Sequence, residues 1–227
     1  MIVSIHQPGY LPWAGFFKKI ESSDFFVFLI DAQYKKNDWQ NRNKIRTSEG
    51  TMWLTVPVKS NFGTTLMNTK IDYTSDWVKK HKKSIEIHYS KAEYFQKYWN
   101  YFESIFDSKP ENLLELNMKF INKIMDILEL DTKTILSTEL KTGTTGSERI
   151  LEICKKLDAN TYISGLFGKD YLILEDFEEN SIQVKFQNFK IQPYRQCYEP
   201  SIDTVSIIDL IFNEGPNSGL ILKNSLN

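Results

Sequence analysis

The chain has 227 residues, of which 41% are hydrophobic and 25% charged, with 28 lysines and arginines against 29 aspartates and glutamates. A chain of this length buries roughly 70% of its unfolded surface without disulfides, and its composition is that of an ordinary globular protein. The formal net charge of -1 excludes the basic excess of a bulk nucleic-acid binder, so we expect no nucleic-acid partner.

The sequence shows no export or membrane signal. No basic region precedes an apolar run at the N-terminus, and no stretch approaches the ~18 apolar residues that a membrane span needs. Cys154 and Cys197 have no metal-ligand spacing, and we expect no disulfide between them. These features predict a cytoplasmic protein without a metal site.

The N-terminal segment combines signals for a strand, a turn and a helix. Residues 1–5 are mostly apolar and predict a short buried strand, while Pro8, Gly9 and Pro12 predict a compact turn. Aromatic and aliphatic residues then recur at helical spacing over residues 13–20. Because α/β proteins bind ligands where a strand ends and a helix begins, we expect a site here.

The next segments predict a second strand and a long loop. Residues 25–31 form an apolar run that ends in an acid, which predicts a strand parallel to the first. Residues 33–50 are polar and rich in asparagine, which predicts a surface loop, and residues 52–58 alternate like a strand.

Three helices are predicted next, at residues 77–89, 91–106 and 111–130. Strand signals return at residues 133–138, 161–165 and 182–189, with helix signals at 147–159, 168–174 and 205–215. This alternation predicts an α/β fold, a Rossmann-like, mainly parallel sheet with helices on both faces. We expect a single α/β domain over residues 1–227, with a helical insert or lid at about 75–130.

His6 is the first candidate for catalysis. A histidine at a strand end beside a helix start can titrate near neutrality and reach a ligand in the crevice. The alternative is a structural histidine bonded to a backbone carbonyl. Gln7 could orient His6 or bind substrate.

His81 is the second candidate, because it lies within a run of lysines at residues 79–83. Like charge from these lysines would depress the pKa of His81 and leave a neutral base. The lysines, Lys80 among them, could bind phosphates together with Arg42 and Arg46. The alternative is a solvated helix face.

Other residues are candidates for substrate binding. Asp31 ends the second strand and could hold a sugar hydroxyl, and the backbone amides around Ser164 and Gly165 could cradle an oxyanion. Such residues also serve as ordinary turn residues. Further candidates for the walls of the pocket are Tyr10, Trp13, Asn41, Tyr194 and Gln196, residue types that line cores as often as sites.

Several well-known signatures are missing. The chain has no GxGxxG, GxxxxGK[ST], HExxH, GxSxG or CxxC, so dinucleotide redox, P-loop, zincin and serine-hydrolase chemistry lose support. Cys154 lies on the apolar side of its predicted helix, which favours burial over nucleophilic use.

Five segments carry a family resemblance. The stretches HQPGYLPWAGFFKKI, IDAQYKKNDWQNRNKI, WLTVPV, YISG and SIIDLIFNEG resemble the WbqC-like protein family over nearly the whole chain. Proteins of this family occur with genes of surface-polysaccharide (O-antigen, lipopolysaccharide) biosynthesis. The resemblance therefore implies cytoplasmic work on sugar nucleotides or activated acyl groups, and some relatives are associated with acyl or aminoacyl transfer to an amino sugar.

From this resemblance we expect a transferase that moves an acyl or aminoacyl group from a thioester to a nucleotide-linked amino sugar. The donor would be coenzyme A or a phosphopantetheinyl group on an acyl carrier protein, with no tightly bound cofactor. His6 or His81 would take the proton from the attacking amine. One alternative is a non-catalytic accessory protein that binds a sugar nucleotide or a carrier. Another is a nucleotidylyltransferase-like enzyme, although both histidines of the HxGH signature are missing at residues 12–16.

Overall fold

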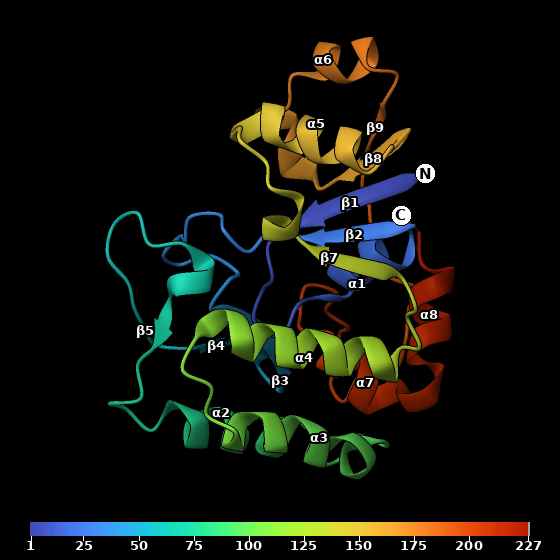
Figure 1. Ribbon diagram of the computed structural model, residues 1–227. Coiled ribbons are helices and arrows are strands. Elements are labelled where there is room, and N and C mark those ends of the chain that lie inside the picture. The colour runs from blue at the N-terminus through green and yellow to red at the C-terminus, as the bar shows by residue number, and fades with distance from the viewer. Residues whose placement is uncertain (227) are drawn as a thin grey trace.

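The computed structural model describes residues 1–226. Its centre is a five-stranded sheet with the order β7-β2-β1-β8-β9, in which all neighbouring strands run parallel (Figure 1). The strands are β1 (Ile2–His6), β2 (Phe25–Phe28), β7 (Lys133–Leu136), β8 (Thr161–Ser164) and β9 (Gln183–Phe186). The predicted α/β fold with a Rossmann-like parallel sheet is confirmed.

The strand order creates a switch point between β1 and β8. From β1 the chain moves outward in one direction to β2 and β7, and then returns to the other side of β1 for β8 and β9. In open α/β sheets, ligands bind outside the carboxyl ends of the strands at such a point. Here the two strands end at His6 and Ser164.

Helices cover both faces of the sheet (Figure 1). Strand side chains alternate between the faces, so Val27 packs toward α5 and α6 while its neighbours Phe26 and Phe28 join a larger cluster on the opposite face. The helices are α1 (Ala14–Glu21), α2 (Trp77–Tyr89), α3 (Phe95–Asp107), α4 (Leu113–Ile127), α5 (Gly146–Lys156), α6 (Leu174–Glu179), α7 (Ile208–Glu214) and α8 (Ser218–Asn224). Within residues 1–226, none of the helices has the length and apolar character needed to cross a membrane.

The helices α2, α3 and α4 belong to the larger of the two buried clusters, together with α1 and β2. Phe120 of α4 lies at the centre of this packing. Its ring centroid is 5.0 Å from that of Phe106 and 6.3 Å from that of Phe102, both on α3, and 5.7 Å from that of Tyr10 in the β1–α1 connection. The segment predicted as a helical insert therefore shares its core with the N-terminal βαβ unit.

Replacing Phe120 with alanine should destabilise the protein by about 3–5 kcal/mol, because the fully buried ring would leave a cavity among three aromatic neighbours. Urea unfolding monitored by circular dichroism measures this loss. The matched control is Tyr101→Ala on α3, where the side chain is half exposed and we expect a change of about 0.5 kcal/mol or less. Equal losses for the two variants would contradict this packing.

The structure corrects the prediction of a loop over residues 33–50. Strand β3 (Arg42–Thr47) pairs antiparallel with β4 (Gly50–Thr55), and β5 (Val58–Lys59) pairs with β6 (Lys70–Ile71). The polar composition of β3 hid its alternation, because a buried asparagine, Asn43, takes an inward position next to Ile45. Near the C-terminus, the helix predicted at residues 168–174 is a 3₁₀ turn (Leu166–Asp170) followed by α6, and α8 was not predicted.

Candidate functional site

His6 lies at the carboxyl end of β1 and is accessible to solvent. Its ring packs edge-on against Phe16 of α1, with the ring centroids 5.2 Å apart. Nδ1 lies 2.9 Å from the backbone oxygen of Gln7. Because a carbonyl oxygen can only accept, Nδ1 carries the proton in this hydrogen bond, and Nε2 of the neutral ring keeps a free lone pair.

The surroundings of His6 keep its imidazole neutral. Although its side chain is partly open to solvent, desolvation by the surrounding protein, helped by the positive charge of Lys19, lowers the pKa of His6. The hydrogen bond to Gln7 opposes this shift only in part. At physiological pH, His6 therefore presents an unprotonated Nε2, but the lowered pKa makes this nitrogen a weak base until the shift is relieved.

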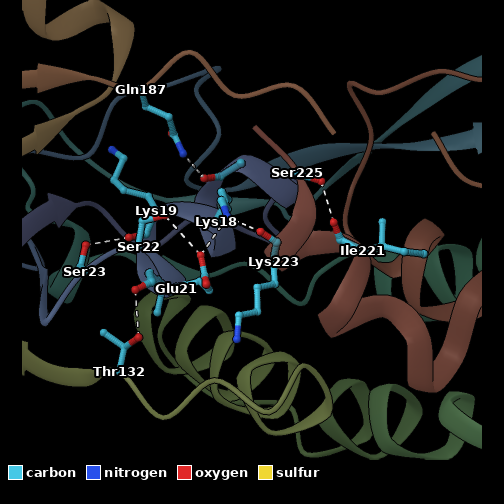
Figure 2. Close-up of polar contacts among 12 residues, drawn as sticks. Lys18, Lys19, Glu21, Ser22, Ser23, Thr132, Gln187, Ile221, Lys223 and Ser225 are labelled. Atoms are coloured by element: carbon cyan, nitrogen blue, oxygen red, sulfur yellow. Dashed lines mark hydrogen bonds and ion pairs between the residues drawn. The ribbon is translucent and has the colours of Figure 1, made fainter. Parts of the chain in front are cut away.

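Lys19 is a buried lysine of α1 that points away from its neighbour Lys18 (Figure 2). All residues of α1 from position 14 to position 20 are buried, so the helix has no solvent face on which to place either lysine. Nζ of Lys18 donates hydrogen bonds to Glu21, at 2.9 Å, and to the backbone oxygen of Lys223, at 2.8 Å. Among residues 1–226, Nζ of Lys19 has no hydrogen-bond or ion-pair partner.

Nζ of Lys19 lies at the switch point of the sheet. A Cβ atom added to Gly165, directly after β8, would lie 3.6 Å from this nitrogen. Desolvation lowers the pKa of Lys19 to about 8, and the same ammonium group acts on His6 at the end of β1. The carboxyl ends of β1 and β8 therefore flank the ammonium group of Lys19, which has no protein partner among residues 1–226 and whose nitrogen keeps some contact with solvent.

Gln187, directly after β9, fixes the start of α1 against the sheet. Its Nε2 donates to the backbone oxygen of Gly15 at 3.0 Å, and its backbone nitrogen donates to the backbone oxygen of Ser164 at 2.8 Å. The indole of Trp13 covers Gly15 so closely that a Cβ there would lie 2.5 Å from the ring. The first turn of α1 is thus covered by an aromatic ring and is not an open phosphate cradle.

The loop between β2 and β3 (residues 29–41) packs against the β1–α1 connection, where Gln7 contacts it. Oε1 of Gln7 accepts a hydrogen bond from Nε2 of Gln40, and the backbone nitrogen of Tyr10 donates to the backbone oxygen of Trp39 at 3.0 Å. Asn41, at the end of this loop, is buried and donates from Nδ2 to the backbone oxygen of Val56 at 2.8 Å. These contacts hold the loop against the β1–α1 connection, next to Gln7.

Asp31 follows β2 at the same edge of the sheet and is already engaged. It accepts hydrogen bonds from Arg149 of α5 and from Ser137, both at 2.6 Å. Partial desolvation raises the pKa of Asp31, but these hydrogen bonds outweigh it and lower the pKa overall. Asp31 thus ties the ends of β2 and β7 to α5.

Comparisons with known proteins identify the family of the chain. The WbqC-like protein family matches residues 7–220. The chain belongs to the WbqC-like protein family. It is 36% identical over 217 residues to a protein of Mycobacterium tuberculosis named "Uncharacterized protein Rv1507c", and the match covers 94% of each chain. No solved structure matches the chain.

In this WbqC-like protein, His81 lies in the aromatic core. It is buried, and its Nδ1 is 2.9 Å from the hydroxyl of Tyr10. Desolvation lowers the pKa of His81 to about 4, so the prediction that neighbouring lysines cause the shift is wrong. Through this hydrogen bond, His81 and Tyr10 brace α2 against the β1–α1 connection.

The basic residues predicted to bind phosphates are dispersed. Lys80 is exposed on α2, whereas Lys82 pairs with Glu103 and Asp107 of α3. Arg46 is buried and donates to the backbone oxygens of Thr47, Gly50 and Pro200, so the prediction that it binds phosphate is wrong. Arg42 stacks over the ring of Trp53, with 4.4 Å between its guanidinium carbon and the ring centroid.

Tyr194 and Gln196 lie in a separate buried network around Asp209 of α7. The hydroxyls of Tyr194 and Tyr89 donate to the two carboxylate oxygens of Asp209, at 2.7 and 3.0 Å, and Nε2 of Gln196 donates to the hydroxyl of Tyr194 at 2.9 Å. Desolvation raises the pKa of Asp209 to about 6, although these tyrosine hydrogen bonds oppose the shift. The network joins α7 to α2.

Asp209 should make stability depend on pH in an unusual direction. Its folded pKa lies above its unfolded value of 3.8, so the contribution of Asp209 to the free energy of unfolding is greatest below pH 4 and is lost as pH rises toward 6. We expect the stability of the wild type relative to Asp209→Asn to fall by about 2 kcal/mol between pH 4 and pH 7. Urea unfolding of both proteins across this range measures it, and a difference that does not change with pH would contradict it.

The predicted and observed site residues can now be compared. Five predicted residues lie together at the carboxyl ends of the strands: His6, Gln7, Asp31, Ser164 and Gly165. Sequence reasoning missed Lys19 and Gln187. One feature of the sequence could have indicated that Lys19 is buried. It lies one helical turn after Phe16, in a helix whose other residues are mostly apolar.

Proposed function

We propose that this WbqC-like protein is a cytoplasmic transferase of surface-glycan (O-antigen) biosynthesis. It transfers an acyl or aminoacyl group from a thioester to the amine of a nucleotide-linked amino sugar. The observation that carries the proposal is His6, a neutral imidazole with a free Nε2 at the switch point of the sheet. The thioester is supplied by coenzyme A or by a carrier protein.

The chemistry needs one base and no covalent intermediate. The amine attacks the thioester carbonyl, the new N–C bond forms and the C–S bond breaks. His6 accepts the amine proton at Nε2 and returns it to the departing thiolate, so the products are an amide and a free thiol. The tautomer fixed by the Gln7 carbonyl places the lone pair on the nitrogen that faces away from the backbone.

The thiols of the chain support direct transfer. Burial raises the pKa of Cys154 to about 12, and desolvation also raises the pKa of Cys197. A thiol with a raised pKa is a poor nucleophile at neutral pH. Direct attack by the amine on the thioester therefore fits the chain better than an acyl-cysteine intermediate.

Purified protein mixed with nucleotide-linked amino sugars and acyl thioesters should form a new amide, detected by mass spectrometry together with an equal amount of free thiol. Tight binding of the sugar nucleotide without product would instead favour an accessory protein. Release of pyrophosphate from a nucleoside triphosphate and magnesium would favour nucleotidyl transfer. Either result would overturn the transferase.

A further inference from the structure

The switch point contains a positive charge without a counter-ion. Lys19 is 2% exposed, and among residues 1–226 no carboxylate lies within ion-pair distance of its Nζ. Lys18, next to it in α1 and also buried, shows the usual solution, with Glu21 at 2.9 Å and a backbone oxygen at 2.8 Å. A buried ammonium group is normally paired in this way, because desolvating an unpaired charge is unfavourable.

The acids on the neighbouring elements are already used. Glu21 of α1 pairs with Lys18, and Asp31 after β2 pairs with Arg149 at 2.6 Å. His6 is the other titratable group that acts at the end of β1, and it is neutral. Among residues 1–226, the charge of Lys19 is therefore left to solvent or to a bound anion.

The space beside Nζ is open. If Gly165 carried a Cβ, this atom would lie 3.6 Å from Nζ of Lys19. Apart from the two adjacent residues in the chain, no other atom of residues 1–226 would lie within 4 Å of it. The backbone of Gly165 has an ordinary φ of -69°, so glycine is not required there by backbone conformation. Its lack of a side chain instead keeps clear the volume that a ligand of Lys19 would occupy.

We propose that Lys19 and the space over Gly165 form an oxyanion-binding site at the carboxyl ends of β1 and β8, which takes a phosphate or carboxylate group of the substrate. This inference rests on the proposed function for the identity of the substrate, and it deepens that function by naming a charged group that the site recognises. Lys19 would bind this group as a charge-assisted hydrogen-bond donor in a poorly solvated position.

Such a ligand would also act on His6. Desolvation accounts for most of the lowering of the His6 pKa, and the charge of Lys19 adds to it. A bound oxyanion neutralises the charge of Lys19, and the pKa of His6 rises. The base therefore becomes stronger when the anionic substrate is in place.

Isothermal titration calorimetry of the whole chain with pyrophosphate, inorganic phosphate and acetate tests the site without turnover. Lys19→Met should weaken binding of the preferred anion about tenfold or more, as expected for the loss of a charged hydrogen bond. Lys18→Met is the matched control, because it removes a second buried lysine that already has partners, and it should change the affinity by about twofold or less. Circular dichroism establishes that both variants are folded.

The variant Gly165→Ala tests the need for open space beside Lys19 without changing the charge of Lys19. The added methyl group leaves Lys19 intact and fills the volume next to its Nζ, so the affinity for the anion should fall about tenfold. Gly143→Ala is the control, because a Cβ there has no neighbour within 4 Å among residues 1–226. That variant should bind like the wild type.

The outcomes show whether the bound group is a phosphate or a carboxylate. They also distinguish a failure of the oxyanion site from a failure of the proposed transferase. Stronger binding of pyrophosphate or phosphate identifies the phosphates of a nucleotide-linked substrate, and stronger binding of acetate identifies a carboxylate, and both support the site. No binding of any of these anions, or equal binding by wild type, Lys19→Met and Gly165→Ala, overturns it. If Lys19-dependent binding is found but no amide forms in the transfer assay, the oxyanion site stands and the transferase fails.

Discussion

Replacing His6 with asparagine should lower the rate of acyl transfer by about 10²–10⁴-fold, the usual contribution of a positioned general base. The asparagine amide can still donate to the backbone oxygen of Gln7, as Nδ1 of His6 does at 2.9 Å, so the connection should keep its shape. What is lost is the lone pair of Nε2 that accepts the amine proton. Steady-state rates of amide formation, followed by mass spectrometry, measure the effect.

The control for this variant is His88→Asn. His88 is a half-buried histidine on α2, in edge contact with the ring of Tyr198 and outside the carboxyl edge of the sheet. Its replacement should change turnover by about twofold or less. Full turnover by a folded His6→Asn protein would show that His6 is not the base.

Replacing Lys19 with methionine should make the protein more stable at pH 7, by about 3 kcal/mol. Desolvation lowers the folded pKa of Lys19 from 10.5 to about 8, so the folded protein holds this proton less tightly than the unfolded chain does. The contribution of Lys19 to the free energy of unfolding is therefore least favourable below pH 8, and it improves as pH rises from 8 to 10.5. Methionine fills similar volume without the charge.

Urea unfolding at pH 7 and at pH 10 measures this gain, which should shrink at the higher pH. Lys18→Met should behave in the opposite way at pH 7 and lose about 1–3 kcal/mol, because it removes hydrogen bonds to Glu21 and to the backbone of Lys223. A Lys19→Met protein that is destabilised as much as Lys18→Met would mean that the ammonium group of Lys19 is paired in solution.

The two expected results together would indicate a site that keeps unfavourable groups for function, at a cost in stability. Lys19 lies close enough to His6 for its positive charge to lower the pKa of the histidine. Natural proteins keep such unfavourable groups where they bind or react with ligands. A Lys19→Met protein that is more stable than the wild type but binds anions more weakly would show that Lys19 is kept for binding and not for stability.

The sequence was informative where one short segment carries its own signal. The run of apolar residues before His6, the proline-rich turn and the helix that follows predicted the βαβ unit, and β1 does pair in parallel with β2. His6 could be chosen because it stands where the strand pattern stops. This reasoning is local, and the parallel register of the first two strands is its direct consequence.

The sequence was less informative where tertiary packing decides. Lys19 looked like an ordinary basic residue beside an apolar stripe, but packing surrounds α1 and buries it. His81 stood in a run of lysines that suggested a surface, and the structure turns its ring into the core against Trp77, with 5.1 Å between the ring centroids. In both cases one helix cannot reveal what covers each of its faces.

The account is tested most directly by nuclear magnetic resonance of His6 in protein labelled with ¹⁵N-histidine, titrated with and without pyrophosphate. We expect the ring to be neutral at pH 5 and above, with the proton on Nδ1 and a bare Nε2, and we expect pyrophosphate to raise its pKa in the wild type but not in Lys19→Met. A His6 ring that is protonated at pH 6 in the free protein, or one whose pKa does not respond to the anion, would contradict the account.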